Sequence, residues 1–206
     1  MKKRIIRIAS LALVILGMVS CSDEQETALR PQDAKSIPMT FLVSYPGQAS
    51  RATETNFEKN DKIGLYVADA KAQLEIGGNL VNNETITYDG SKWAAARALY
   101  WDKGTYTAYA YYPYIENVSS ITDQSFSVAL DQRVAKTATS LGGYEASDLL
   151  FATSKNISAS ASPINLTFKH IMSKLKIRLV KGEDFEGEMP TTADVYIHNT
   201  VPTATV

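Results

Sequence analysis

The segment Thr105–Tyr112 reads TYTAYAYY and decides the fold class, because its side chains fall alternately on two faces. A period of two is the spacing of a β-strand, whereas an α-helix repeats every 3.6 residues. Tyrosine and threonine also favour strands over helices. The segment therefore predicts a strand with these four residues on one face: Tyr106, Ala108, Ala110 and Tyr112.

The same period of two recurs along the chain after residue 36. It is clearest in Lys174–Leu179, where Leu175, Ile177 and Leu179 are predicted to face inward while the basic residues face water. Other segments also predict strands by alternation or by a short apolar run. These are Pro38–Tyr45, Lys62–Val67, Thr85–Tyr88, Leu99–Trp101, Ser125–Leu130, Leu149–Ala152, Ile164–Phe168 and Asp194–His198.

Helical spacing is limited to Ala68–Leu74 and Trp93–Leu99, and both stretches are too short for more than a turn or two. Many short strands without long helices are typical of a β-sandwich. We therefore predict an all-β fold, a β-sandwich of two antiparallel sheets with short helical turns only. The predicted domain covers residues 37–190, and residues 191–206 are its last strand or the stub of a second domain.

The composition narrows the classes of function. With 206 residues, 45% of them hydrophobic and 21% charged, the chain can bury one core and is not intrinsically disordered. A formal net charge of −1 argues against a nucleic-acid partner, which requires a concentrated basic surface. One cysteine and two histidines leave little for a disulfide or a metal site, so we expect no cofactor and no metal.

The N-terminus predicts export. Residues 1–20 read MKKRIIRIASLALVILGMVS, a basic start and an apolar run too short to span a bilayer easily. Cys21, the only cysteine, follows directly, and this placement resembles a lipoprotein signal in which the cysteine receives acyl chains such as palmitate. A plain signal peptide followed by an unrelated cysteine is the alternative. We predict a lipid anchor at Cys21 and a flexible polar tether over residues 21–36. The run Ser22-Asp23-Glu24 resembles signals that send lipoproteins of some Gram-negative anaerobes to the outer cell surface, and this resemblance implies a surface-exposed position on the outer membrane.

The candidate catalytic residues are few. A nucleophilic triad needs a base, and the histidines His170 and His198 are more commonly structural in such positions. Paired carboxylates lie in exposed polar runs, and the glycine pairs lack the strand-to-helix context of a phosphate loop. We predict that the protein has no catalytic residues and is not an enzyme. A hydrolase that depends on His170 is the least favoured hypothesis.

The tyrosines permit a second function. Several of the eleven tyrosines fall between Tyr106 and Tyr114, where exposed rings could stack on sugars. Core packing and cross-strand pairing explain the same residues equally simply and are favoured. A surface glycan-binding lipoprotein that uses exposed tyrosines, Tyr109 and Tyr111 among them, is the alternative function.

Several short motifs occur together in a fixed order between Cys21 and about Lys181. They are Arg51–Phe57, Glu58–Val67, Tyr100–Trp101, Gly104–Tyr106, Ala110–Tyr114, Ser147–Ala152 and Leu166–Ile177. In this order they resemble the fimbrillin-like family, lipoprotein pilus subunits of Gram-negative anaerobes. Members of that family usually have a second β-sandwich domain, and we expect this sequence to lack most of it, as a truncated reading frame, a fragment or a one-domain variant would.

The resemblance implies a structural subunit or accessory component of an adhesive surface pilus. Its partners would be other pilus subunits, the outer membrane and a host or bacterial surface receptor. In that family a trypsin-like protease cuts after an arginine, and a neighbouring subunit's strand then fills the vacated groove. By position the cut falls between Arg51 and Ala52, unless Arg51 is an ordinary surface arginine. The first strand, with its inward residues Met39, Phe41, Val43 and Tyr45, is then the one exchanged.

Overall fold

The structure is a computed structural model that describes residues 37–46, 56–121, 123–193 and 195–205. The predicted signal peptide, the lipid site Cys21, the tether and the cleavage site at Arg51 and Ala52 all lie outside the described residues. Within the described residues, no helix has the length and hydrophobicity needed to cross a membrane.

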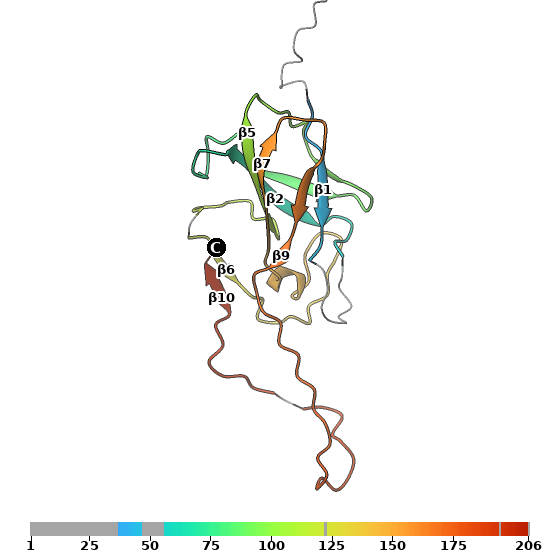
Figure 1. Cartoon of the computed structure of the whole chain (residues 1–206). Helices are drawn as coiled ribbons and strands as arrows, with labels where there is room; N and C mark the ends of the chain where they lie inside the picture. The colour runs from blue at the N-terminus through green and yellow to red at the C-terminus, as the bar shows by residue number, and fades with distance from the viewer. Residues whose placement is uncertain (1–36, 47–55, 122, 194, 206) are drawn as a thin grey trace, which may run out of the picture. The chain divides into compact units, whose positions relative to one another are not determined.

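The main element is an antiparallel sheet of six strands in the order β4-β3-β2-β5-β7-β9 (Figure 1). Consecutive strands pair in the hairpins β2-β3 and β3-β4, and the chain turns at Asp89-Gly90 in the second of these. The strands are β2 (Lys62–Asp69), β3 (Val81–Tyr88), β4 (Trp93–Ala95), β5 (Thr105–Tyr112), β7 (Leu150–Ser158) and β9 (Lys169–His170).

The strand β5 has the predicted bounds and lies between β2 and β7 in the sheet. Its predicted inward residues all belong to the hydrophobic core, and Ala108 and Ala110 are fully buried. Because alanine side chains are small, side chains of the second layer can pack closely against β5 at these two positions.

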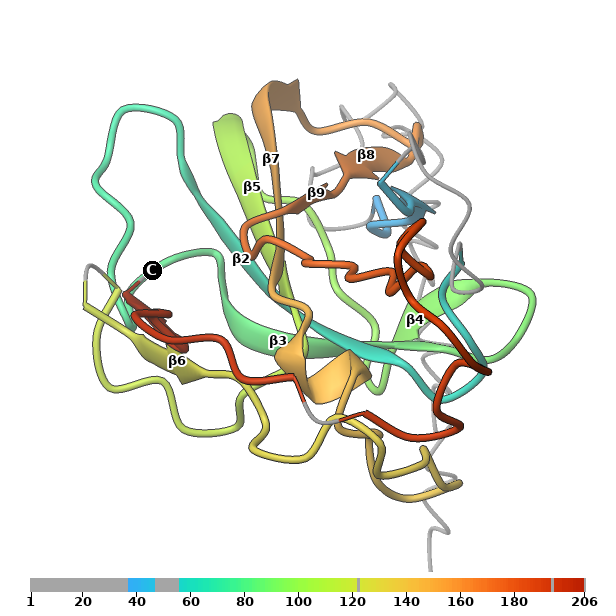
Figure 2. The ribbon, with the colours of Figure 1, turned by 90° about the horizontal axis from the view of Figure 1, so that it is seen from below.

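A second layer covers the core face of this sheet. It contains β1 (Phe41–Ser44) and β8 (Ile164–Thr167), which lie side by side (Figure 2). Ile164 and Leu166 are buried against the core of the large sheet, as their alternation predicted. The all-β prediction is confirmed. The pairing of β1 with β8 is parallel, however, and not antiparallel as predicted. The prediction missed this because alternation along one strand does not indicate the direction of its partner.

The opposite face of the sheet is covered by the connection between β5 and β6 (Ser125–Ser127), and β6 pairs antiparallel with β10 (Thr203–Thr205) (Figure 2). Tyr66, Tyr109 and Tyr111 lie under this connection and line an apolar cavity of about 80 Å³. Tyr109 and Tyr111 are therefore half-buried, and the flat exposed platform required for sugar stacking is not formed there.

Several predicted elements are wrong. Lys174–Leu179 forms no strand, and its apolar residues are exposed, Leu175 at 65%. Alternation gives a segment an apolar face, but a strand also needs a neighbouring edge, and no described strand pairs with this segment. Trp93–Leu99 begins with β4 instead of a helical turn, because the preceding turn returns it to β3. The expected strand at Leu99–Trp101 is reduced to an isolated β-bridge between Tyr100 and Pro38. Residues 195–198 of the last expected strand are exposed and form no strand.

Gly64 in β2 is required by the packing on the face of the sheet that the connection between β5 and β6 covers. A Cβ atom at Gly64 would overlap the ring of Tyr111, its cross-strand neighbour in β5. The ring cannot easily move, because its hydroxyl donates to Asn83 Oδ1 (2.5 Å) and accepts from Ile115 N (3.3 Å).

Replacing Gly64 by alanine should therefore lower the free energy of unfolding by about 1–3 kcal/mol, the usual effect of overpacking. Chemical unfolding followed by tryptophan fluorescence measures this change. Gly77→Ala is the matched control, because no atom lies within 4 Å of the added Cβ there. Equal stabilities of the two variants would contradict the proposed overlap.

Candidate functional site

The first strand, β1, lies between β8 and the connection between β4 and β5, and backbone hydrogen bonds at both ends hold it in this position, which we call the groove. Residues 41–44 pair with residues 164–167 of β8, and the segment before them reaches the connection between β4 and β5. The flanking hydrogen bonds run from Met39 N to Leu99 O (2.8 Å), Trp101 N to Ile37 O (3.0 Å), Ile164 N to Thr40 O (2.8 Å) and Phe168 N to Ser44 O (3.0 Å). Removal of β1 would leave these partner groups without hydrogen bonds.

The side chains of β1 divide between the groove and the solvent. Met39 is buried, and Phe41, Val43 and Tyr45 pack half-buried against the core. Leu42, on the opposite face, is 57% exposed. The structure therefore brings the four predicted inward residues of this strand together on one face.

An aromatic cluster closes the groove at the C-terminal end of β1. Phe57 lies at its centre, with Tyr45 and Trp93 at ring-centroid distances of 5.0 Å, Phe168 at 5.5 Å and Tyr112 at 5.6 Å. All four contacts are edge-to-face, the arrangement that aromatic quadrupoles favour. The two described ends of the segment that contains the predicted cleavage site, near Tyr45 and Phe57, therefore lie in contact.

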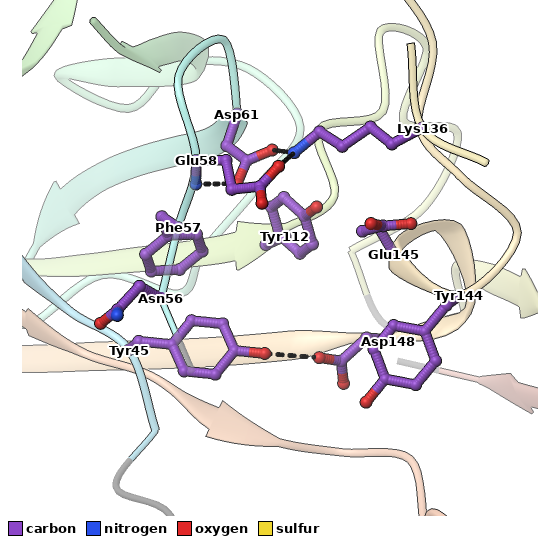
Figure 3. A pocket seen from close by; sticks show the side chains of 10 residues that line it. All are labelled: Tyr45, Asn56, Phe57, Glu58, Asp61, Tyr112, Lys136, Tyr144, Glu145 and Asp148. Atoms are coloured by element: carbon purple, nitrogen blue, oxygen red, sulfur yellow. Dashed lines mark hydrogen bonds and ion pairs between the residues drawn. The ribbon is translucent and has the colours of Figure 1, made fainter. Parts of the chain in front are cut away.

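A pocket of about 160 Å³ opens beside this cluster (Figure 3). The Tyr45 hydroxyl points to Asp148 and donates to its Oδ2 at 3.1 Å (Figure 3). His170 Nδ1 lies 2.7 Å from the other carboxylate oxygen, and because a carboxylate can only accept, the imidazole donates. The lining residues are Tyr45, Asn56, Phe57, Glu58, Asp61, Tyr112, Lys136, Tyr144, Glu145 and Asp148.

A partly buried ion pair forms the opposite wall of the pocket. Lys136 Nζ lies 2.6 Å from Asp61 Oδ1 and 3.1 Å from Glu58 Oε2. Asp61 Oδ2 also accepts from the backbone N–H of Glu58 (2.7 Å). Burial by itself lowers the pKa of Lys136, but the hydrogen bonds and charges of Asp61 and Glu58 outweigh burial and raise this pKa. Lys136 is therefore a firmly charged side chain.

Tyr112 and His170 are titratable groups at or next to this pocket. Burial, reinforced by the nearby carboxylates of Asp61, Glu145 and Asp148, raises the pKa of Tyr112, so its hydroxyl stays neutral. His170 Nδ1 is engaged by the Asp148 carboxylate at 2.7 Å, and its structural role stays a prediction. Among the residues that the structure describes, no group of acidic, histidine or cysteine side chains is arranged to hold a metal ion.

The sequence predicted one side of this site and missed the other. Met39 to Tyr45 were found by alternation. Asp148, Asp61 and Lys136 were not, because Asp148 is 103 residues from Tyr45 and Lys136 is 75 residues from Asp61. A single carboxylate or lysine in a loop carries no signal of such distant partners.

The fold and the groove define a class of protein: an all-β domain whose first strand fills a groove on the core side of a larger sheet. A family model described as fimbrillin-like matches residues 50–206. The chain belongs to the fimbrillin-like family, and the resemblance seen in the sequence is confirmed.

Individual relatives match parts of the chain. A Bacteroides ovatus protein named "Putative fimbrium tip subunit Fim1C" is 30% identical over 129 residues, 58% of this chain and 23% of that protein. Two crystal structures described as putative cell adhesion proteins each match 65% of the chain. The one from Bacteroides uniformis is 18% identical, with 47% of it covered and a TM-score of 0.44. The one from Bacteroides ovatus is 20% identical, with 51% of it covered and a TM-score of 0.45.

Proposed function

We propose that the chain is a subunit or accessory component of a cell-surface pilus that assembles by donor-strand exchange and supports adhesion. Its role is structural and not catalytic. The observation that carries the proposal is that β1, a strand of four residues, fills a core groove and is joined to the domain through the segment containing Arg51. Membership of the fimbrillin-like family supports the same role.

The energetics explain why the groove cannot stay empty. Burying a large apolar side chain contributes about 1.5–3 kcal/mol, and β1 with its flanking residues supplies Met39 and three partly buried side chains. Leaving the partner backbone groups unpaired adds a further cost. A domain that loses β1 therefore needs another strand of the same pattern, and a neighbouring subunit would supply it.

Export and anchoring complete the proposal. Cys21 would carry the lipid that holds the precursor on the outer membrane, and a protease cut after Arg51 would free β1 for exchange. Other pilus subunits are the expected partners, with a surface receptor for the assembled pilus. The division into a domain at residues 37–190 and a terminal strand or stub at 191–206 stays a prediction.

Treatment of the purified mature chain with a trypsin-like protease tests the proposal. The expected product has a new N-terminus at Ala52, and a ladder of polymers is expected on gels of unboiled samples. Arg51→Gln is the control and should remain uncut at this position and monomeric. A chain that stays intact and monomeric, although the protease cleaves a reference substrate in the same tube, would count against the proposal.

A further inference from the structure

The groove under β1 is apolar along most of its length and polar at one end. Met39, Phe41 and Val43 occupy the apolar part, where Ile164 and Leu166 belong to the same core. Two residues beyond Val43, the side chain of Tyr45 reaches a carboxylate instead (Figure 3). The groove therefore presents a different chemistry to the fourth inward position of any strand that fills it.

Asp148 is arranged to receive one hydrogen-bond donor at that position. Its side chain is only 13% exposed, and one carboxylate oxygen is already occupied by His170 at 2.7 Å. The other oxygen accepts from Tyr45. A strand without a donor here would leave this shielded oxygen poorly satisfied, which costs more than an exposed group would.

The ring of Tyr45 is recognised as well as its hydroxyl. It makes edge-to-face contacts with Phe57 at 5.0 Å and His170 at 5.8 Å. Glu145 and Asp148 line the pocket around it, so an acidic side chain at this position would be repelled. Shape therefore favours an aromatic ring at this position, and the carboxylates favour a side chain that carries a donor and no negative charge.

We propose that Asp148, held in position by His170, determines which donor strand the groove accepts. The preferred strand has apolar side chains at three alternate positions and a tyrosine at the fourth. This inference rests on the proposed strand exchange and adds the chemistry of the incoming partner. Tyr45 of the chain's own β1 is the internal example of the preferred residue.

Competition between peptides tests the inference on the full mature chain, with a single-site protease sequence in place of residues 48–53. After one cut, the chain is incubated with excess fluorescein-labelled peptide PMTFLVSY (Pro38–Tyr45), and exchange is followed by fluorescence anisotropy. Unlabelled peptides then compete. The Tyr45→Phe peptide should bind roughly tenfold more weakly, the loss expected for a hydrogen bond to a charged acceptor.

Two further peptides separate this inference from strand exchange itself. Leu42→Ala changes an exposed side chain and should compete as well as the unchanged peptide, whereas Phe41→Ala should compete poorly because it loses groove contacts. On a chain carrying Asp148→Ala, the unchanged peptide and the Tyr45→Phe peptide should bind equally. The main comparison uses the unsubstituted domain, so it does not depend on how that variant folds.

The outcomes are distinct. Equal competition by the unchanged peptide and the Tyr45→Phe peptide on the unsubstituted domain overturns the role of Asp148 and leaves strand exchange standing. A tenfold preference that persists on the Asp148→Ala chain also overturns it. If no peptide exchanges, or if Phe41→Ala competes as well as the unchanged peptide, the proposed function fails and this inference fails with it.

Discussion

Replacing Phe168 by alanine should lower the free energy of unfolding by about 3–5 kcal/mol, the range for removing a buried aromatic ring. Phe168 is 1% exposed and contacts Phe57 edge to face at 5.5 Å. It follows β8 directly, and its backbone N–H donates to Ser44 at the end of β1. The substitution therefore removes packing at the point where the groove, the aromatic cluster and the core meet.

Urea unfolding monitored by tryptophan fluorescence measures this loss as a lower midpoint at an unchanged slope. The matched control is Phe185→Ala, because Phe185 is 44% exposed and lies outside the core. Its effect should stay within about 0.5 kcal/mol. A similar loss for both variants would contradict the placement of Phe168 in the core.

Replacing Asp61 by alanine should lower the free energy of unfolding by about 3 kcal/mol, because it leaves Lys136 without its buried partner. The Asp61 side chain is 5% exposed and that of Lys136 is 17% exposed. Glu58 keeps one contact with Lys136 but is itself 66% exposed, so it replaces little of the loss. The backbone N–H of Glu58 also loses its acceptor.

A double-mutant cycle separates the ion pair from the other effects of this substitution. Lys136→Met removes the charge but keeps the apolar stem, and the double variant should be more stable than Asp61→Ala alone. Asp131→Ala breaks an exposed pair with Arg133 and should leave the urea midpoint unchanged. Additive effects of the Asp61 and Lys136 substitutions would show that the two charges are not coupled.

The alternating pattern predicted much of the fold. It identified β5 at its observed bounds, the core residues of β8 and the inward face of β1. It failed at Lys174–Leu179, where the alternation is regular but no described strand pairs with the segment. The local pattern indicates which face of a segment is apolar, but whether the segment pairs with another strand depends on the rest of the fold.

The candidate site was predictable only where it is made of a single segment. Met39 to Tyr45 lie on one strand, so their spacing is visible in the sequence. The acceptor for Tyr45 and the ion pair of Lys136 depend on loops that the fold brings together over long sequence separations. The resemblance to the fimbrillin-like family suggested which strand would be exchanged, but the polar contact of Tyr45 with Asp148 became visible only in the structure.

The contact between Tyr45 and Phe57 has a consequence for the timing of the proposed strand exchange. Residues 47–55 connect Tyr45 to Phe57 along the chain, and the ring centroids of these two residues are 5.0 Å apart. This covalent connection therefore keeps β1 at an effective concentration on the order of millimolar or above. A cut within it breaks none of the described contacts of β1. It turns an intramolecular strand into a separate ligand, whose retention depends on dilution and on competing strands. Proteolysis would thus act by abolishing this local concentration advantage, and the groove would stay filled until a competitor arrives.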